Sequence, residues 1–195
     1  MPTGVQLRDA RGQLFDAAER VLLRAGPNAL TSRAVTTEAG CAKGVLHRYF
    51  PDFDGFLTEL VLDRAARIDG QSAALCESAG TGTVAGNLTD ALLSLFQSVA
   101  VAIVGLVTFR DELRRRLRQA RPAGGLPVLT EAAQMIAAYL TAERDLGRIA
   151  ADADVDTLAP TLIGAAHLPF SDREGTPPDF ASVHKIVAAI LAGVS

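Results

Sequence analysis

The sequence predicts an all-α protein in which a short N-terminal helix-turn-helix segment precedes a helical-bundle domain. Hydrophobic residues make up 49% of the 195-residue chain. They recur at helical spacing, whereas β-branched residues rarely alternate with polar ones as a half-buried strand requires. Charge is uneven, because residues 1–50 hold seven basic and four acidic side chains although the whole chain has a net charge of −3. A basic end on an acidic body indicates that the first quarter meets a polyanion.

The first two helices are predicted from apolar spacing and from the residues that end or cap them. Leu14 and Leu22 belong to a helical pattern over residues 8–25. Gly26 and the proline after it are expected to end that helix, because proline cannot continue the hydrogen-bond ladder. Thr31 is suited to cap a second helix that ends at Gly40.

The third helix is expected over residues 42–49, within the stretch "GCAKGVLHRYF". Val45, Leu46 and Phe50 can face inward on it. Two short helices joined by a glycine-containing turn are typical of a helix-turn-helix, and a small cationic helix fits a DNA major groove. A solvated helix packed on a bundle is the alternative. The residues expected on the outer surface are Lys43, Gly44, His47, Arg48 and Tyr49.

The segment "LTSRAVTTEAGCAKGVLHRYFPDFDGFL" resembles the DNA-binding segment of the TetR family of bacterial repressors. That family's usual pattern is close to T-x-x-x-I-A-x-x-A-G-V-S-x-G-x-L-Y-x-Y-F-x-x-K-x-x-L. The resemblance covers about a quarter of the chain. It implies a dimeric, ligand-responsive regulator that binds double-stranded operator DNA. The residues that fall at the family's spacing are Gly40, Gly44, Leu46, Tyr49, Phe50 and Leu57.

The resemblance also implies roles for individual residues. Thr31 and Ser32 would cap the second helix and touch a phosphate, and Arg33 would reach a guanine. Arginine can read guanine O6 and N7 through two hydrogen bonds, and cationic side chains release counterions from phosphates. Lys43, Gly44 and His47 would approach base edges. Arg48 and Tyr49 would hold the DNA backbone.

Three positions depart from the family pattern. Ala42 replaces the usual serine cap of the third helix, a loss of about 1 kcal/mol. His47 replaces a common tyrosine, and Phe53 stands where a lysine often meets phosphate. These departures bear on the detailed DNA contacts, not on the fold.

The body of the chain is predicted as a helical ligand-binding and dimerisation domain over residues 52–195, after a DNA-binding domain over residues 1–51. The stretch from 70 to 87 is rich in small residues and is expected to be a flexible loop. The helix over 110–120 carries several arginines, so it is either a solvated amphipathic helix or a second nucleic-acid patch. Further helices are expected near 52–69 or beyond, 84–108, 127–147, 154–171 and 178–193.

The last two predicted helices carry apolar stripes. One stripe comprises Leu158, Leu162, Ala166 and Phe170, and the other comprises Val183, Val187, Ile190 and Val194. Either stripe could serve the core of one subunit. TetR-like proteins pair through their last two helices, so the resemblance implies a homodimer in which these stripes face a partner.

A small-molecule effector site is the next expectation. Residues 91–109 carry no charge. If this helix faces the one over 127–147, five side chains would line an apolar cavity for an uncharged or weakly polar effector. A solid core is the alternative. The five residues are Phe96, Val99, Ile103, Met135 and Tyr139.

Other classes of protein are not favoured by the sequence. We find no nucleophile elbow, zinc-protease motif or phosphate loop, so we expect no enzyme activity, no metal and no cofactor. Residues 91–109 could suggest a membrane helix, but Ser94 and Gln97 interrupt that run, and a buried bundle helix is equally apolar. Two cysteines and no secretory signal indicate a cytoplasmic protein. A helical-bundle enzyme and a membrane-associated helical protein remain the alternatives.

Overall fold

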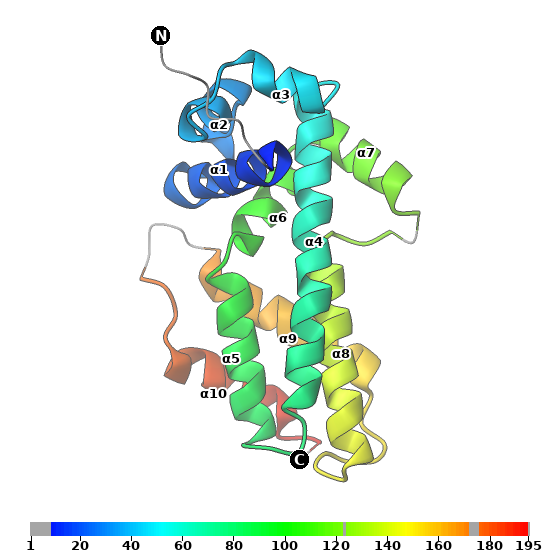
Figure 1. Cartoon of the computed structure of the whole chain (residues 1–195). Helices are drawn as coiled ribbons and strands as arrows, with labels where there is room; N and C mark the ends of the chain where they lie inside the picture. The colour runs from blue at the N-terminus through cyan, green and yellow to red at the C-terminus, as the bar shows by residue number, and fades with distance from the viewer. Residues whose placement is uncertain (1–8, 123, 172–175, 195) are drawn as a thin grey trace. The chain divides into compact units, whose positions relative to one another are not determined.

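The computed structural model describes residues 9–122, 124–171 and 176–194, and in these ranges the only regular secondary structure is helical (Figure 1). The all-α prediction is confirmed. The elements are α1 (Ala10–Ala25), the 3₁₀ turn η1 (Pro27–Ala29), α2 (Ser32–Glu38), α3 (Gly44–Tyr49), α4 (Phe53–Glu77), α5 (Val84–Phe96), α6 (Ala100–Thr108), α7 (Asp111–Ala120), α8 (Leu129–Asp145), α9 (Val155–Phe170) and α10 (Phe180–Leu191).

Contacts divide the chain into two compact units. The first comprises residues 1–63 and 102–124, and the second comprises residues 64–101 and 125–195. One boundary therefore falls inside α4 and another inside α6. Helix α7, which sequence reasoning assigned to the body, belongs by its contacts to the same unit as α1, α2 and α3. The functional division at residue 51 stays a prediction.

The first unit is built on an aromatic cluster. Phe15 of α1, Phe50 after α3 and Phe56 of α4 lie with ring centroids 5.0 to 5.7 Å apart. All three are buried, as are Leu113 and Leu117 on the inner face of α7. Aromatic pairs at such separations stabilise a core beyond the area they bury. The cluster joins α1 to the end of α3 and the start of α4.

The second unit packs α9 against α8, α10 and α5. Its core includes five of the eight residues of the two apolar stripes, and the other three, Leu158, Ile190 and Val194, are half-buried. Leu162, Ala166, Phe170, Val183 and Val187 are buried within the single chain. The expectation that the stripes face a partner is therefore wrong for these five residues, because their side chains already fill the subunit's own core. Pairing through the last two helices stays a prediction.

Two other expectations about the body need correction. The stretch from 70 to 87 is not one loop, because α4 continues to Glu77 and α5 begins at Val84. The helix predicted over 84–108 is broken between Phe96 and Ala100. The loop was predicted because the stretch is rich in small residues. Alanine and serine are also compatible with a helix, so this composition does not exclude a continuation of α4.

Helix α8 begins two residues later than the sequence predicts. Val128 has a φ of 75°, a conformation that β-branched residues rarely adopt. Its N–H donates to Oε2 of Glu131 at 2.7 Å, which satisfies one of the free amides at the helix start. The buried Glu131 carboxylate thus stabilises the entry into α8.

Within the described ranges, no single helix is long and apolar enough to cross a membrane. Only α5 and α6 taken together reach that length and composition, and they are interrupted between Phe96 and Ala100.

Candidate nucleic-acid interface

Helix α2 begins at the threonine that the sequence marks as its cap. Thr31 Oγ1 accepts a hydrogen bond from the Ala34 N–H at 3.1 Å. Ser32 is half-buried, and its Oγ has no hydrogen-bond partner among the described residues. Arg33 is exposed. The predicted cap is confirmed, and the start of α2 holds a buried hydroxyl without a partner next to an exposed arginine.

The turn into α3 depends on one glycine. Gly40 has a φ of 64°, which favours glycine because a side chain would be strained there. No side chain caps the start of α3, in keeping with the alanine at position 42. A Cβ built at Gly44 would meet nothing within 4 Å, so no packing contact inside the chain requires a glycine at that position.

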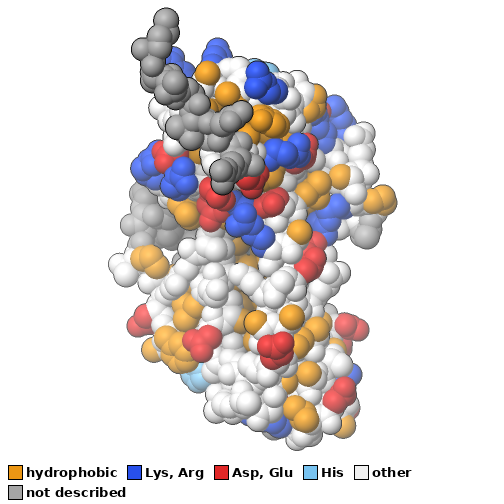
Figure 2. Space-filling view, in the orientation of Figure 1, with side chains coloured by type: hydrophobic (Ala, Val, Ile, Leu, Met, Phe, Trp, Pro, Cys, Tyr) orange, Lys and Arg blue, Asp and Glu red, His pale blue; other side chains and the backbone are white. Residues whose placement is uncertain are grey.

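Helix α3 separates its residues into an inner and an outer face. Leu46 is fully buried, and Phe50 follows the helix in the aromatic cluster. Figure 2 shows Lys and Arg side chains gathered over the helices of the first unit. The exposed residues of α3 and its start are Lys43, Gly44, His47, Arg48 and Tyr49, as the sequence predicts.

Arg11 of α1 holds the C-terminal end of α3. Its Nη1 donates to the carbonyl oxygen of Tyr49 at 3.4 Å, and its guanidinium lies 4.7 Å from the centre of the Phe50 ring. It also pairs with Glu59 of α4. A cation at a helix C-terminus is favoured by the helix dipole. Arg11 therefore fixes α3 between α1 and α4.

Glu38 joins α2 to α1. Its two carboxylate oxygens accept hydrogen bonds from Arg20 Nε and Arg24 Nη2, each at 2.8 Å. These bonds, first that from Arg20 and then that from Arg24, hold the pKa of Glu38 below its usual range. The pair of arginines thus ties the last turn of α2 to one face of α1.

Asp52 joins the start of α4 to α7. Its Oδ1 accepts from the Gly55 N–H at 2.7 Å, which caps α4. Arg116 donates to both carboxylate oxygens, at 2.7 and 2.9 Å, and to Glu112 through Nε. The Arg116 guanidinium is the main reason that the pKa of Asp52 is lowered. Helix α7 thereby holds the residue at which α4 begins, three positions after α3 ends.

Sequence reasoning missed these bracing residues. Arg20 and Arg24 are spaced one helical turn apart, which places them on one face of α1. The spacing did not reveal the acceptor, because Glu38 lies 14 residues after Arg24. Asp52 and Arg116 are 64 residues apart, and no local pattern connects them.

Residues 14–60 match the sequence model described as bacterial regulatory proteins, tetR family. This range contains α2, α3 and the side chains that brace them. The chain carries the DNA-binding domain of the TetR family. The sequence resemblance is confirmed, including the helix-turn-helix over α2 and α3.

Solved TetR-like structures share the fold over almost the whole chain. A TetR transcription regulator from Haloarcula marismortui has a TM-score of 0.68 and 14% identity, covering 95% of this chain and 98% of that chain. The fatty acid degradation regulator FadR from Bacillus halodurans has a TM-score of 0.69 and 18% identity, with coverages of 97% and 98%. FadR from Bacillus subtilis, in complex with stearoyl-CoA, has a TM-score of 0.67 and 17% identity, with coverages of 94% and 99%. No curated protein matches the sequence.

The five predicted effector residues of this TetR-like body are all buried. Phe96, Val99, Met135 and Tyr139 belong to the second unit, and Ile103 belongs to the first. Phe96 packs against Phe170 and against the ring of His167, with centroids 5.5 and 5.6 Å away. Burial lowers the pKa of His167. That the five residues enclose one ligand stays a prediction.

Tyr139 is already engaged by its own chain. Its hydroxyl donates to Glu143 Oε1 at 2.5 Å and accepts from Asn87 Nδ2 at 2.9 Å. Burial, followed by the bond to Glu143, raises the pKa of Tyr139. Glu143 is fully buried and pairs with Arg148, whose Nη1 lies 3.2 Å from Oε2. The network ties α5, α8 and the segment after α8 together.

Among the described residues, no group of three or more histidine, cysteine or acidic side chains is arranged to hold a metal ion. Cys41 and Cys76 are both free thiols.

Proposed function

We propose that the chain is a DNA-binding transcriptional repressor that releases a palindromic operator when it binds a small apolar molecule. One observation carries the proposal: the exposed cationic face of α3, held from below by Leu46 and Phe50, lies inside the TetR-family match. The glycine at position 44, which no internal contact requires, leaves room for a close approach to DNA. The proposal includes no catalytic activity and places the protein in the cytoplasm.

In this proposal, one set of residues contacts the bases and another set contacts the phosphates of the DNA. Arg33, Lys43 and His47 would read bases with Gly44 at close approach. The phosphate contacts would come from Thr31, Ser32, Arg48 and Tyr49. The Ser32 hydroxyl has no hydrogen-bond partner among the described residues, and it would have to turn outward to donate to a phosphate oxygen.

The test begins with duplexes selected from a random-sequence library by the full chain. Arg33→Ala should weaken binding by about 1 to 3 kcal/mol and relax preference at one base pair, whereas Arg48→Ala should weaken all sequences alike and reduce the salt slope by about one. Competition gel shifts measure both. Arg118→Ala removes an exposed arginine of α7 and should change neither property if α7 is a solvated helix, whereas weaker binding would identify α7 as a second nucleic-acid patch. Unchanged preference in Arg33→Ala would show that this residue does not read bases.

In the proposed homodimer, the solvent-exposed faces of α9 and α10 contact the same helices of a second chain. On α9, Thr161, Gly164 and Leu168 are exposed, and Leu168 is 74% exposed. On α10, Ala188 and Ala192 are exposed. Small residues allow close helix packing, and an exposed leucine gains from being covered. Two-fold symmetry would then match a palindromic operator.

Sedimentation at micromolar concentration tests the dimer. Leu168→Glu should give monomers that keep their helical circular dichroism. Leu146→Glu, at an exposed position just after α8, is the control and should leave the dimer intact. Val187→Glu is unsuitable, because Val187 is buried in the subunit core. A wild-type chain that sediments as a monomer would contradict the dimer.

The proposed effector is an uncharged or weakly polar molecule held by Phe96, Val99, Ile103, Met135 and Tyr139. The complex of the similar FadR with stearoyl-CoA supports an apolar ligand in a body of this fold. By linkage, a ligand that weakens operator binding must itself bind more weakly to the operator-bound chain. Titration with hydrophobic metabolites, antibiotics and dyes, followed by operator anisotropy, measures release. Phe96→Ala should alter the affinity for a releasing ligand and leave ligand-free operator binding intact.

A further inference from the structure

The excess of positive charge in the first unit comes from α7 and the arginines at its two ends. Residues 1–63 contain seven basic and eight acidic side chains, because the acidic side chains of residues 51–63 offset the basic excess before them. Residues 102–124, the other part of this unit, contain six arginines and two acidic side chains. Fixed charge of one sign raises the local concentration of a ligand of the opposite sign. The first unit therefore attracts a polyanion chiefly through α7.

Two arginines of α7 are used within the chain. Arg116 donates to both carboxylate oxygens of Asp52, at 2.7 and 2.9 Å. Arg114 donates to the carbonyl of Thr108 at 3.1 Å and pairs with Asp111. The bonds from Arg116 hold α7 next to Asp52, three positions after the last residue of α3. Helix α7 is thus fixed beside the end of the helix that is proposed to read DNA.

Arg115 and Arg118 lie at the surface of α7. They are three residues apart, which places them on one face of the helix, opposite the buried Leu113 and Leu117. The Arg115 side chain is 63% exposed and pairs with Glu112 of the same helix. An exposed pair of this kind contributes little free energy, so a phosphate can compete for the guanidinium. Arg118 is exposed and forms no ion pair with a described residue.

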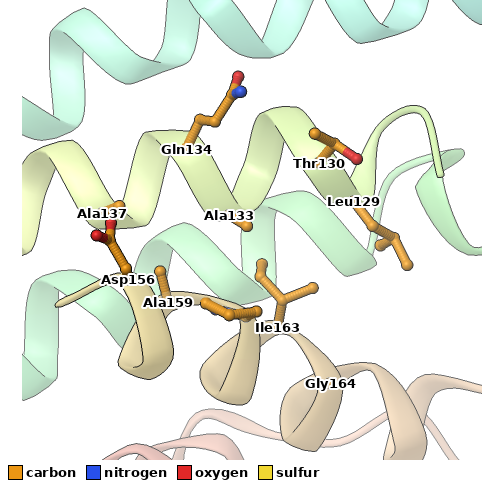
Figure 3. A pocket seen from close by; sticks show the side chains of 10 residues that line it. Leu129, Thr130, Ala133, Gln134, Ala137, Asp156, Ala159, Ile163 and Gly164 are labelled. Carbon is orange, nitrogen blue, oxygen red and sulfur yellow. The ribbon is translucent and has the colours of Figure 1, made fainter. Parts of the chain in front are cut away.

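The groove of the second unit does not suit a polyanion. It lies between α8 and α9, with a volume of about 460 Å³ and a mainly apolar lining (Figure 3). No cationic side chain lines it, and Asp156 adds a negative charge. Its α9 wall includes Gly164, which belongs to the face that the proposed homodimer covers. A polyanion is therefore expected to meet α7 and not this groove.

We propose that Arg115 and Arg118 contact phosphates of the operator DNA that α3 reads, so that α7 forms a second cationic surface beyond the helix-turn-helix. This inference rests on the proposed function, because it requires the chain to bind DNA. Arginine donates to a phosphate through two N–H groups in a fixed geometry. Contacts to phosphates position a protein on DNA and carry no sequence information. The two arginines therefore contribute to the affinity and its salt dependence, but not to the choice of sequence.

The test uses the full chain and the duplexes that it selects from a random-sequence library. Operator anisotropy gives the affinity between about 50 and 200 mM salt. Arg115→Gln and Arg118→Gln each remove one positive charge, and each should reduce the slope of log affinity against log salt by about one. Base preference in competition gel shifts should stay as in wild type. Arg115→Lys and Arg118→Lys keep the charge at the same positions and, as matched controls, should keep the slope.

Failure of this inference can be distinguished from failure of the proposed function. If the full chain selected no duplex, both would be wrong. If it bound an operator and both glutamine variants kept the wild-type salt slope, the contact through α7 alone would be wrong. A changed preference at a base pair in either glutamine variant would also contradict it, since phosphate contacts carry no sequence information. If the glutamine variants kept the DNA slope but lost binding to phosphatidylglycerol vesicles, the surface would serve a membrane, and the proposal would be wrong.

Discussion

The two compact units use charged side chains in different ways. In the first, ion pairs lie near the surface and join helices around α3: Glu38 with Arg20 and Arg24, and Asp52 with Arg116. In the second, Glu143 is fully buried and is satisfied by Tyr139 and Arg148. Exposed pairs contribute little free energy, whereas removing one partner of a buried pair leaves an uncompensated charge or polar group. We infer that the ion pairs of the first unit position α3, whereas the buried charge of the second unit holds the helices of its core together.

The largest effect should come from breaking the buried network at its centre. Glu143→Ala leaves the Tyr139 hydroxyl and the Gly80 N–H without their acceptor. It also removes the ion pair of Arg148, which keeps backbone carbonyls as acceptors. Since each buried polar group without a partner costs about 1 to 3 kcal/mol, we expect the free energy of unfolding to fall by about 3 to 5 kcal/mol. Urea denaturation measures it. Asp145→Ala, two residues away and exposed, is the control and should stay within about 0.5 kcal/mol of wild type. If Glu143→Ala lowered the free energy of unfolding by less than about 1 kcal/mol, the buried charge would contribute no more than an exposed ion pair, and the proposed difference between the units would be wrong.

A smaller effect is expected from Tyr139→Phe. This change removes the hydroxyl between Glu143 and Asn87 while the ring still fills the core. A hydrogen bond to a charged group contributes about 1.5 to 3 kcal/mol, so the free energy of unfolding should fall by that amount. The same urea experiment measures it. If Tyr139→Phe matched wild type, Arg148 and the Gly80 N–H would be sufficient to satisfy the buried carboxylate.

In the first unit, two substitutions at Asp52 separate capping from ion pairing. Asp52→Asn keeps a side chain that can cap α4 and loses the ion pair with Arg116, whereas Asp52→Ala loses both. We expect the urea midpoint to fall less in the asparagine variant than in the alanine variant, and in both to fall less than in Glu143→Ala. An equal fall in the two Asp52 variants would mean that the ion pair, not the cap, positions the start of α4.

The smallest expected effect is a change in the free energy of unfolding that appears only at acidic pH. Because Glu38 has a lower pKa in the folded chain than in the unfolded chain, the unfolded state binds its proton first as the pH falls. The stability from this group is therefore fully present above pH about 4.3 and is lost as the pH falls through the lower folded pKa. Glu38→Gln should flatten that part of the stability curve, measured by urea midpoints between pH 6 and pH 2.5 on the order of half-unit steps. An unchanged acid slope would show that the pair with Arg20 and Arg24 is not formed in solution.

Much of the first unit could be predicted from local sequence. The Thr31 cap, the Gly40 turn and the inward Leu46 are confirmed. Each depends on residues within one or two helical turns, so a short pattern is sufficient. The exposed set around Lys43 and Arg48 follows from the same helical spacing. The roles of these residues at DNA stay predictions.

The sequence by itself therefore determined that the chain is helical, where α2 and α3 lie, and which side chains α3 exposes, because helical periodicity and capping act over a few residues. Only the tertiary structure decided that the stripes of α9 and α10 face inward, that Glu143 is buried beside Tyr139, and that Arg116 reaches Asp52. An apolar stripe looks the same whether it covers its own core or a partner. The acceptor of a charged group 64 residues away depends on how helices pack, and no local spacing records that packing.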